Sequence, residues 1–466
     1  MKRAGVPPDY TTYLTLARTF ATRGLYRETL ALLEDMEHVG LKPDLAFFHE
    51  MARNANRLSS AEFWKTLDEM DKHGVRPDAA IWTGAIQQFA SAGNVELALE
   101  TLYNVREDGL EPELPAAEAV VTLLCEKGYV NLALDVVDWF EGFSIRPMSP
   151  QSWMECLGAA AIEGCMDHTV RCWNKAVVEY GVIPDEGLCL AVLAVAARHG
   201  QAEFAISQPL TTIASAGITL SHKHIAPVIE AFGAGGNLRD AFTFLHSLPN
   251  FNLEPPLSSL EAVAAHCLPD IDAIDSAWAT VDELHSASQL SIAALNTIIL
   301  AAAHHSDLQR ALGAYKSLPT YNLTPDTDTF NILLDACVAA QHRQLGDALL
   351  ADVKAAGVPV ARGTYDRMVR LCLTQPEYDD AFFYLNEMEA AGYVPPASLY
   401  EAIVRKCAGA GDTRYEIALE EMRKRKMVVS QGLMGEVGAL MRRAGGAGEA
   451  QHVDGQGHEL PPSRDP

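Results

Sequence analysis

Apolar residues recur along the chain at the spacing of an amphipathic helix. Ala381, Tyr384, Leu385 and Met388 occupy positions i, i+3, i+4 and i+7, and the stretch that starts at Phe330 repeats the pattern. Such a stripe buries one face of a helix. A glycine separates two such stretches, and the second stretch ends in Gly-x-x-Pro. Because glycine adopts the left-handed conformation that ends a helix and proline cannot continue one, each unit is predicted to be helix, turn, helix, turn.

This punctuation repeats with a period close to 35 residues. The prolines that close successive units are 35, 34, 35, 35 and 37 residues apart, at Pro8, Pro43, Pro77, Pro112, Pro147 and Pro184. One helical pair cannot bury its own apolar face, so the pairs are expected to stack on one another. The sequence therefore predicts an all-α fold, a right-handed α-solenoid superhelix of about 12 helix-turn-helix repeats.

The positions of the punctuation define the predicted domain boundaries. A partial repeat at 1–9 precedes the array, a capping helix is expected at 431–443, and the Gly-rich polar stretch 444–466 is expected to be a disordered tail. Two prolines are predicted to disturb their units, because Pro209 should kink a second helix and Pro269 should end a first helix early. The repeats themselves are placed at 10–44, 45–78, 79–113, 114–148, 149–185, 186–221, 222–256, 257–291, 292–326, 327–361, 362–396 and 397–430.

The amino-acid composition and the absence of known motifs exclude several classes of function. Lys plus Arg number 36 and Asp plus Glu 61, so the formal net charge is -25, which argues against a broadly basic surface that would bind any phosphate backbone. No apolar run is long enough for a transmembrane helix, and the start of the chain resembles neither a secretory signal nor a transit sequence. Without a C-x-x-C motif, a Gly-rich phosphate loop or a cluster of catalytic spacing, we expect no enzyme, no metal site and no cofactor.

Several residue types that could carry chemistry are expected to be structural instead. Cys337, Cys372 and Cys407 share one repeat position. Buried, reduced thiols are a simpler interpretation than a row of metal-binding cysteines. His304 could touch phosphate from a first helix. The tryptophans are expected in the core or between repeats. They are Trp64, Trp139, Trp173 and Trp278 in second helices, and Trp82 and Trp153 in first helices.

One recurrent run resembles the pentatricopeptide repeat family. The run Met-x-x-x-Gly-x-x-Pro-Asp occurs at 1–9, 36–44 and 70–78, and residues 329–334 (TFNILL) are similar to the family's Thr-Tyr-Asn-x-Leu-Ile. The zinc-deaminase signature with which some members end is absent. The resemblance implies single-stranded RNA as the partner in a chloroplast or mitochondrion, bound in a concave groove with one base per repeat. It also implies a role in RNA processing, stabilisation or translation.

The resemblance also implies which side chains read the bases, namely the fifth residue of each repeat together with its last. Asn296 with Asp326 is the pair expected to favour uridine, and Asn331 follows it without a carboxylate partner. Thr83 with Glu113 would read a purine. His49 with Asp78 completes the predicted set. The other fifth positions depart further from the family, and they include Glu118, Met154, Leu190, Ala226, Glu261, Asp366 and Glu401.

The acidic composition leaves a second hypothesis open. The same array could be a protein–protein interaction scaffold with no direct RNA contact, in which the groove or the acidic convex face docks a peptide or a ribosomal protein. Other organellar RNA-processing proteins are further candidate partners. In the RNA hypothesis, scattered basic groups would add attraction for phosphate; they are Arg198, Arg367, Arg370 and Arg405. A positive or neutral groove would favour RNA, and a uniformly acidic one would favour a protein partner.

Overall fold

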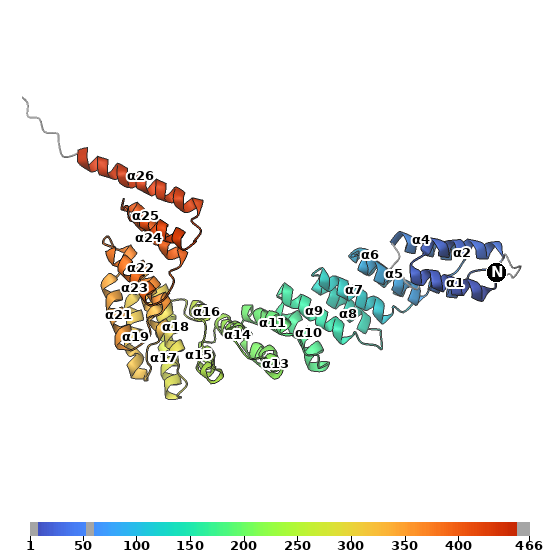
Figure 1. The fold of residues 1–466 in the computed structure, drawn as a ribbon. Helices are drawn as coiled ribbons and strands as arrows, with labels where there is room; N and C mark the ends of the chain where they lie inside the picture. Colours follow the sequence, from blue (N-terminus) through green and yellow to red (C-terminus); the bar gives the residue numbers. More distant parts are fainter. Residues whose placement is uncertain (1–7, 53–59, 454–466) are drawn as a thin grey trace, which may run out of the picture. The chain divides into compact units, whose positions relative to one another are not determined.

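A computed structural model describes residues 8–52 and 60–453 of the chain, and Figure 1 traces its helices. Every regular element in this described part is helical, and none is a strand. The first seven residues of the predicted partial repeat 1–9 and residues 454–466 of the predicted tail lie outside the described residues. The described chain is therefore all-α.

The helices form two compact units, and each is described by itself. The first unit ends at Thr219, and the second begins at Leu220 and also takes in Gly200–Ala202. We call the first helix of each repeat its A helix and the second its B helix. The A helices of the first unit are α1 (Tyr10–Arg23), α3 (Leu45–Ala52), α5 (Ala79–Ser91), α7 (Leu114–Glu126), α9 (Pro150–Glu163) and α11 (Glu186–Arg198). Its B helices are α2 (Tyr26–His38), α4 (Ser60–Lys72), α6 (Val95–Glu107), α8 (Val130–Glu141), α10 (Met166–Trp173) with the π-helical segment Asn174–Glu179, and α12 (Ala202–Ala205), Ile206–Leu210 and α13 (Thr211–Ser215).

The second unit continues the alternation. Its A helices are α14 (His222–Ala234), α16 (Leu257–Cys267), α18 (Ile292–His304), α20 (Thr327–Ala339), α22 (Arg362–Thr374) and α24 (Ala397–Gly409). Its B helices are α15 (Leu238–Ser247), α17 (Ile271–Ser286), α19 (Leu308–Ser317), α21 (Arg343–Ala355), α23 (Asp379–Ala390) and α25 (Tyr415–Lys424). Short 3-10 segments, Leu248–Phe251 and Leu318–Tyr321, extend α15 and α19. A last helix, α26 (Gln431–Val453), follows α25.

The A helices begin where the punctuation places them. Each starts at the first residue of its predicted repeat except α9, which begins at Pro150 because Ser149 is its N-cap and accepts a hydrogen bond from the Ser152 N–H. Aspartates cap α1, α5, α11 and α20 in the same way, each accepting from the backbone N–H three residues on. An N-cap side chain satisfies a backbone donor that the first turn leaves unpaired. A capping residue at a fixed interval therefore fixes the helix starts.

The turns that end the helices use the left-handed conformation, as the glycine series predicts. Gly93 and Gly128, which separate an A helix from its B helix, have φ of 77° and 79°. Where the glycine series is interrupted, other residues adopt the same conformation. Among the described residues they are Asn252, Ser288, Ser306, Asn322, Gln341 and Lys426, with φ between 56° and 58°.

Stacking of successive A helices builds the core of each unit. In the first unit α5 packs on α7 and α7 on α9, and in the second α14, α16, α18, α20 and α22 follow one another in the same manner. In several repeats the A helix also contacts its own B helix through a small residue that opens the apolar stripe of the B helix, such as Ala98 and Ala133, both fully buried. Small residues at this point allow the two helix axes to approach closely.

The two predicted disturbances are confirmed. Pro209 lies in a π-helical segment, Ile206–Leu210, and α16 ends at Cys267, two residues before Pro269. Proline cannot donate to an α-helical hydrogen bond and its ring clashes with the preceding turn, so the wider π turn accommodates it. The starts of α9, α11 and α14 are 36 residues apart, and the B helices between these starts contain both π-helical segments.

The last helix closes the second unit. Leu433 and Val437 on α26 are buried in the cluster that contains Ile403, Val404 and Met422. The helix runs to Val453, ten residues past the end predicted at 443, because Ala, Glu and Gln in this stretch favour helix despite the glycines between them. Among the described helices, none is both long and apolar enough to cross a membrane.

Candidate nucleic-acid interface

The start of α20 fixes the carboxylate of the first predicted reading pair. Asp326 is the N-cap, and its Oδ1 accepts from the Thr329 N–H at 2.7 Å. In return the Asp326 N–H donates to the Thr329 hydroxyl oxygen at 3.2 Å. This reciprocal capping box satisfies two backbone donors and holds the carboxylate in one orientation.

Asn296 joins this network from the preceding A helix, α18. Its Nδ2 donates to Asp326 Oδ1 at 3.1 Å and to Oδ2 at 3.3 Å. The Thr329 hydroxyl lies 2.7 Å from Asn296 Oδ1 and 2.8 Å from Asp326 Oδ1, and its single proton can be donated to one of them at a time. Asn296 is only 1% exposed. The structure therefore brings the predicted pair together, but it buries the amide that was expected to face a base.

The predicted pair His49 and Asp78 is in contact and open to solvent. His49 Nε2 lies 2.9 Å from Asp78 Oδ2, and both side chains are 38% exposed. Asp78 caps α5 by accepting from the Ile81 N–H at 3.1 Å, which orients its carboxylate toward the end of α3. An imidazole ring can donate or accept a hydrogen bond and can stack on a base.

The remaining predicted residues are positioned differently. Asn331 Oδ1 accepts from the Thr364 hydroxyl at 3.0 Å, and Asn331 is 8% exposed. The Thr83 hydroxyl donates to the Ala79 carbonyl of its own helix at 2.8 Å. Glu113 is the N-cap of α7 but makes no side-chain cap bond. Within the described residues, the structure does not join Thr83 to Glu113 by a hydrogen bond.

Sequence reasoning missed the threonine at the third position of an A helix. Thr329 and Thr364 each follow an asparagine of the preceding A helix by 33 residues and each bond to it. The repeated Asn-to-Thr interval was the signal that could have identified them. Glu118, which was set aside as a poor reader, accepts from the backbone N–H of Ser149 at 3.3 Å, so it too contacts the cap of the next A helix.

A second row of contacts, also missed, joins the ninth residue of one A helix to the sixth residue of the next. Because consecutive A helices keep one register, these two positions face each other at successive junctions. The contacts are Arg18 with Glu50 at 2.7 Å, Thr122 with Glu155 at 2.6 Å, Asp335 with Arg367 at 2.8 Å, and Arg405 with Glu436 at 2.8 Å.

Three of the four arginines that were expected to attract phosphate are paired with carboxylates, and two of them, Arg367 and Arg405, belong to this row. Arg367 pairs with Asp335, Arg370 Nε lies 2.7 Å from Asp366, and Arg405 pairs with both Glu401 and Glu436. The fourth, Arg198, is exposed at the end of α11. An RNA phosphate would have to compete with these carboxylates for three of the four arginines that were predicted to bind it. The A-helix surface is therefore mixed in charge rather than positive.

The cysteines of the shared repeat position are buried, as predicted. Cys337, Cys372 and Cys407 are fully buried, and burial raises the pKa of the Cys337 thiol to about 11 and that of Cys372 to about 12. These thiols are protonated at neutral pH, and a protonated thiol is neither a metal ligand nor a strong nucleophile. Across residues 8–52 and 60–453, no three His, Cys, Asp or Glu side chains are grouped as a metal site.

Comparison with protein families matches two segments of the helical array. A family model described as "Pentatricopeptide repeat domain" matches residues 65–116, and one described as "Pentatricopeptide repeat-containing protein" matches residues 186–318. Both segments contain A and B helices in the register described above. The chain is a pentatricopeptide repeat protein.

Curated relatives of this pentatricopeptide repeat protein include members from Arabidopsis thaliana. It is 26% identical over 434 residues to a mitochondrial pentatricopeptide repeat-containing protein, across 85% of this chain and 68% of the relative. A second relative, a putative pentatricopeptide repeat-containing protein, is 25% identical over 190 residues, or 41% of this chain and 37% of the relative. The chain thus spans about two thirds of the first relative and little more than a third of the second.

Two solved structures, one of them a pentatricopeptide repeat protein by its description, also resemble this chain. The maize protein PPR10, in complex with an 18-nucleotide psaJ RNA element, is 16% identical with a TM-score of 0.38, over 98% of this chain and 75% of that one. Yeast Rmd9p in complex with a 16-nucleotide target RNA is 10% identical with a TM-score of 0.36, over 98% of this chain and 100% of that one. Both TM-scores lie below 0.5, so neither structure adds to what this chain's own helices show.

Proposed function

We propose that this pentatricopeptide repeat protein binds single-stranded RNA along the face formed by its A helices. The observation that carries the proposal is the contact between the fifth residue of an A helix and the cap of the next A helix. It recurs between His49 and Asp78, between Glu118 and Ser149, and between Asn296 and Asp326. Two groups held together at the same position of these three repeats suit the reading of one base per repeat. Membership of a family of organellar RNA binders supports the same assignment.

The accessible pair is the most direct candidate for a base contact. His49 and Asp78 are both 38% exposed and already hydrogen-bonded, so a base edge can reach them without rearrangement of the helices. At the Asn296 and Asp326 pair, the carboxylate is half-buried and the amide is buried. We therefore propose His49 and Asp78 as the principal base-reading residues. The less accessible residues rank below them as candidates; these are Asn296, Asn331, Thr83 and Glu113.

Paired arginines set the expected salt dependence. Binding to single-stranded nucleic acid weakens with salt by a slope of about -0.7 per neutralised phosphate. Because Arg367, Arg370 and Arg405 already pair with carboxylates, these three arginines are not free to replace counterions. We expect a shallow slope, on the order of -1 to -2, with much of the affinity coming from contacts to bases.

The experiment crosslinks RNA to the protein, sequences the bound fragments, and titrates the recovered element against purified protein. His49→Ala should weaken binding about tenfold through one nucleotide, since a good base contact discriminates on this scale. The matched control is His38→Ala, an exposed histidine at the end of the B helix α2. The absence of any enriched RNA, or an equal effect of both variants, would contradict the proposal.

A protein scaffold without direct RNA contact is the second candidate. The burial of Asn296 and the ion pairs of three arginines favour it, because both leave the A-helix face with little to offer a phosphate. In this case, purification of the protein from its own organelle should recover a stoichiometric protein partner that resists nuclease. The recovered material should contain no enriched RNA sequence.

We propose an organellar location and a non-catalytic role in RNA processing, stabilisation or translation. Two relatives named as mitochondrial, 26% and 18% identical, support a mitochondrion ahead of a chloroplast. Fractionation of the source cells, with an antibody raised against this chain, tests the location. Enrichment with chloroplasts or with the cytosolic fraction would contradict it.

A further inference from the structure

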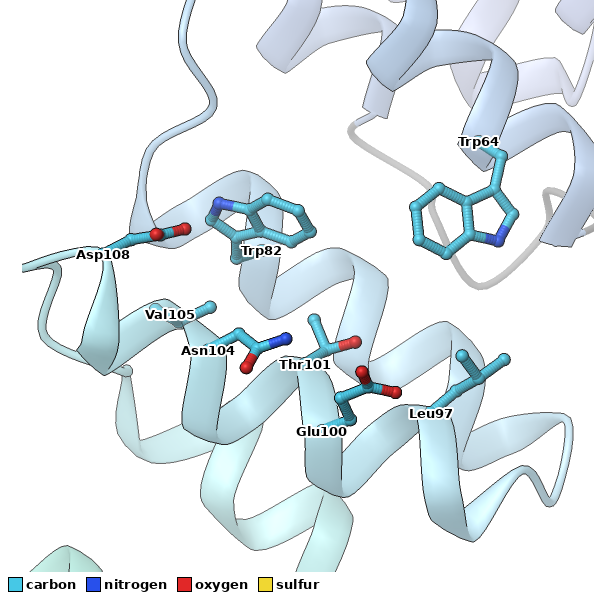
Figure 2. Close-up of a pocket in the computed structure, with 8 residues that line it drawn as sticks. All are labelled: Trp64, Trp82, Leu97, Glu100, Thr101, Asn104, Val105 and Asp108. Carbon is cyan, nitrogen blue, oxygen red and sulfur yellow. The ribbon is translucent and has the colours of Figure 1, made fainter.

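A cleft of about 370 Å³ opens in the first unit between the B helix α6 and its neighbours α4 and α5. Figure 2 shows the indoles of Trp64 and Trp82 on either side of an open space above α6. Glu100, Asn104 and Asp108 line it from α6 and from the residue that ends α6. The volume lies within the range of small-ligand pockets, so the cleft can accept one long side chain.

The sequence of α4 accounts for the opening. The apolar stripe of a B helix begins with a small residue at this position, such as Thr29 in α2 and Ala98 in α6, but α4 has Phe63 there. Phe63 is fully buried with its edge against Phe89, at a ring separation of 6.5 Å. A phenyl ring in place of a methyl group keeps α4 from packing closely against its neighbours. The small residue that lets two helices approach closely is replaced here by a large one.

The exposure of Trp64 is the result. Trp64 was expected to pack in the core or between repeats, but its side chain is 43% exposed. One face of the indole stacks on Phe89 at 5.7 Å and 28°. The rest of the ring borders the cleft opposite Trp82. An exposed tryptophan that borders a cavity favours a binding role over a packing role.

The polar groups of the cleft are negative or unsatisfied. Glu100 and Asp108 are both exposed, and within the described residues neither carboxylate makes an ion pair or a hydrogen bond. Thr101 is only 8% exposed, and its hydroxyl has no hydrogen-bond partner in the described part of the chain. A cation that offers several N–H donors would match two free carboxylates, a free hydroxyl and two π faces.

The next junction of B helices shows what fills such a space in this protein. Between α6 and α8, Tyr103 meets Trp139 at 4.7 Å, and the guanidinium of Arg106 lies 3.6 Å above the ring of Phe143. The chain thus places its own arginine against aromatic rings at that junction. At the junction of α4 and α6 the aromatic rings are present, and among the residues that the structure describes, no arginine lines the cleft.

We propose that this cleft binds an arginine side chain on the surface of a protein partner. The guanidinium lies between Trp64 and Trp82 and pairs with Glu100 or Asp108. Tryptophan is the strongest aromatic partner for a cation, and the planar guanidinium can stack while it donates to a carboxylate. RNA is disfavoured because its phosphates would approach two unpaired carboxylates. The site is independent of the RNA-binding face.

The probe is the peptide acetyl-Gly-Arg-Gly-amide, and its neutral counterpart contains citrulline in place of arginine. Binding is followed through the indole N–H resonances of the protein, with Trp64→Phe and Trp82→Phe used to assign the two resonances of the cleft. The arginine peptide should shift these two resonances saturably and leave Trp278, which stacks on Tyr321 in the second unit, unchanged. The citrulline peptide should bind at least about fivefold more weakly, because it lacks the charge.

Two carboxylate variants test the pairing. Glu100→Gln should weaken the arginine peptide about threefold to fivefold, whereas Glu107→Gln, an exposed glutamate on the same helix outside the lining, should leave it unchanged. Equal binding of the arginine and citrulline peptides, equal effects of the two glutamines, or no saturable shift would each overturn the proposal. So would preferential binding of a mononucleotide at the same two resonances. Unchanged RNA affinity of Glu100→Gln would separate this site from the RNA-binding face.

Discussion

The A helices α18 and α22 occupy the same place in their repeats, yet they present opposite surfaces. In α18 ten consecutive residues, Ala293–Ala302, are buried, and the helix contains no Asp, Glu, Lys or Arg. In α22 Asp366, Arg367 and Arg370 stand on the corresponding face and pair with carboxylates or with one another. Caps and turns set the register of a repeat, but the residues between them decide whether its face is core or surface. A base-reading position is therefore no guarantee of a base-reading residue.

The largest expected effect comes from truncating the ninth residue of each of these two helices. Leu300→Ala in α18 removes a side chain that is 6% exposed and should destabilise the second unit by about 2–5 kcal/mol. Arg370→Ala in α22 removes a side chain that is 38% exposed and should cost under about 1 kcal/mol. Urea denaturation of the two variants measures the difference. Equal losses would mean that α18 is not packed on this face.

A smaller loss is expected from Asn296→Ala. The variant leaves Asp326 and Thr329 without their partner in a buried network and should cost about 1–3 kcal/mol of stability. RNA affinity should change little, because the amide is buried. The double mutant with Thr329→Val should cost less than the sum of the two single variants, since both remove the same hydrogen bond. Additive losses would show that the two residues act separately.

Releasing a paired arginine should strengthen RNA binding. Asp335→Asn removes the carboxylate that pairs with Arg367 at 2.8 Å, so the guanidinium becomes available to a phosphate. Affinity for the recovered RNA should rise several-fold, and the salt slope should steepen by about 0.7, the contribution of one phosphate. Glu377→Gln, which makes the same charge change on an exposed turn, serves as the control. An equal gain from both variants would indicate a general effect of net charge.

The smallest effect concerns Asp328, which lies beside Asp326 in the first turn of α20. Burial, and then the charges of Asp326 and Glu254, raise the pKa of Asp328 above its ordinary value of 3.8. The folded protein therefore holds this proton more tightly than the unfolded chain, so stability is greatest below the unfolded value and falls as pH rises through the folded value. Asp328→Asn should remove that fall and gain under about 1 kcal/mol at neutral pH. Thermal unfolding between pH 3 and pH 7 measures it, and parallel curves for the two proteins would contradict the prediction.

The starts of the helices could be predicted from the sequence because their signals are local. Capping aspartates and left-handed glycines act within a few residues, so a period of about 35 could be followed along the chain. Where glycine is missing, Ser306 and Gln341 adopt the same left-handed turn. The identity of these two residues does not predict the left-handed conformation, because it costs about 1–2 kcal/mol for residues other than glycine. The packed helices on both sides impose it.

The candidate site was predictable in its positions but not in its accessibility. The pairing of Asn296 with Asp326 follows from the register alone, whereas the burial of Asn296 depends on every neighbour of α18. The cleft beside Trp64 depends on Phe63, a large residue where α2 has Thr29 and α6 has Ala98. Burial and cavities are properties of several repeats packed together, and a pattern read one repeat at a time does not contain them.

The π-helical segments in two neighbouring B helices show how the array can accommodate a repeat of a different length. Measured between the starts of successive A helices, each lies in a repeat that is one residue longer than the common period of 35. A π turn holds an additional residue inside the helix, so the surplus is absorbed before the next cap and every later repeat keeps its phase. Single-residue insertions within B helices can therefore change the length of one repeat without changing the register of the repeats that follow.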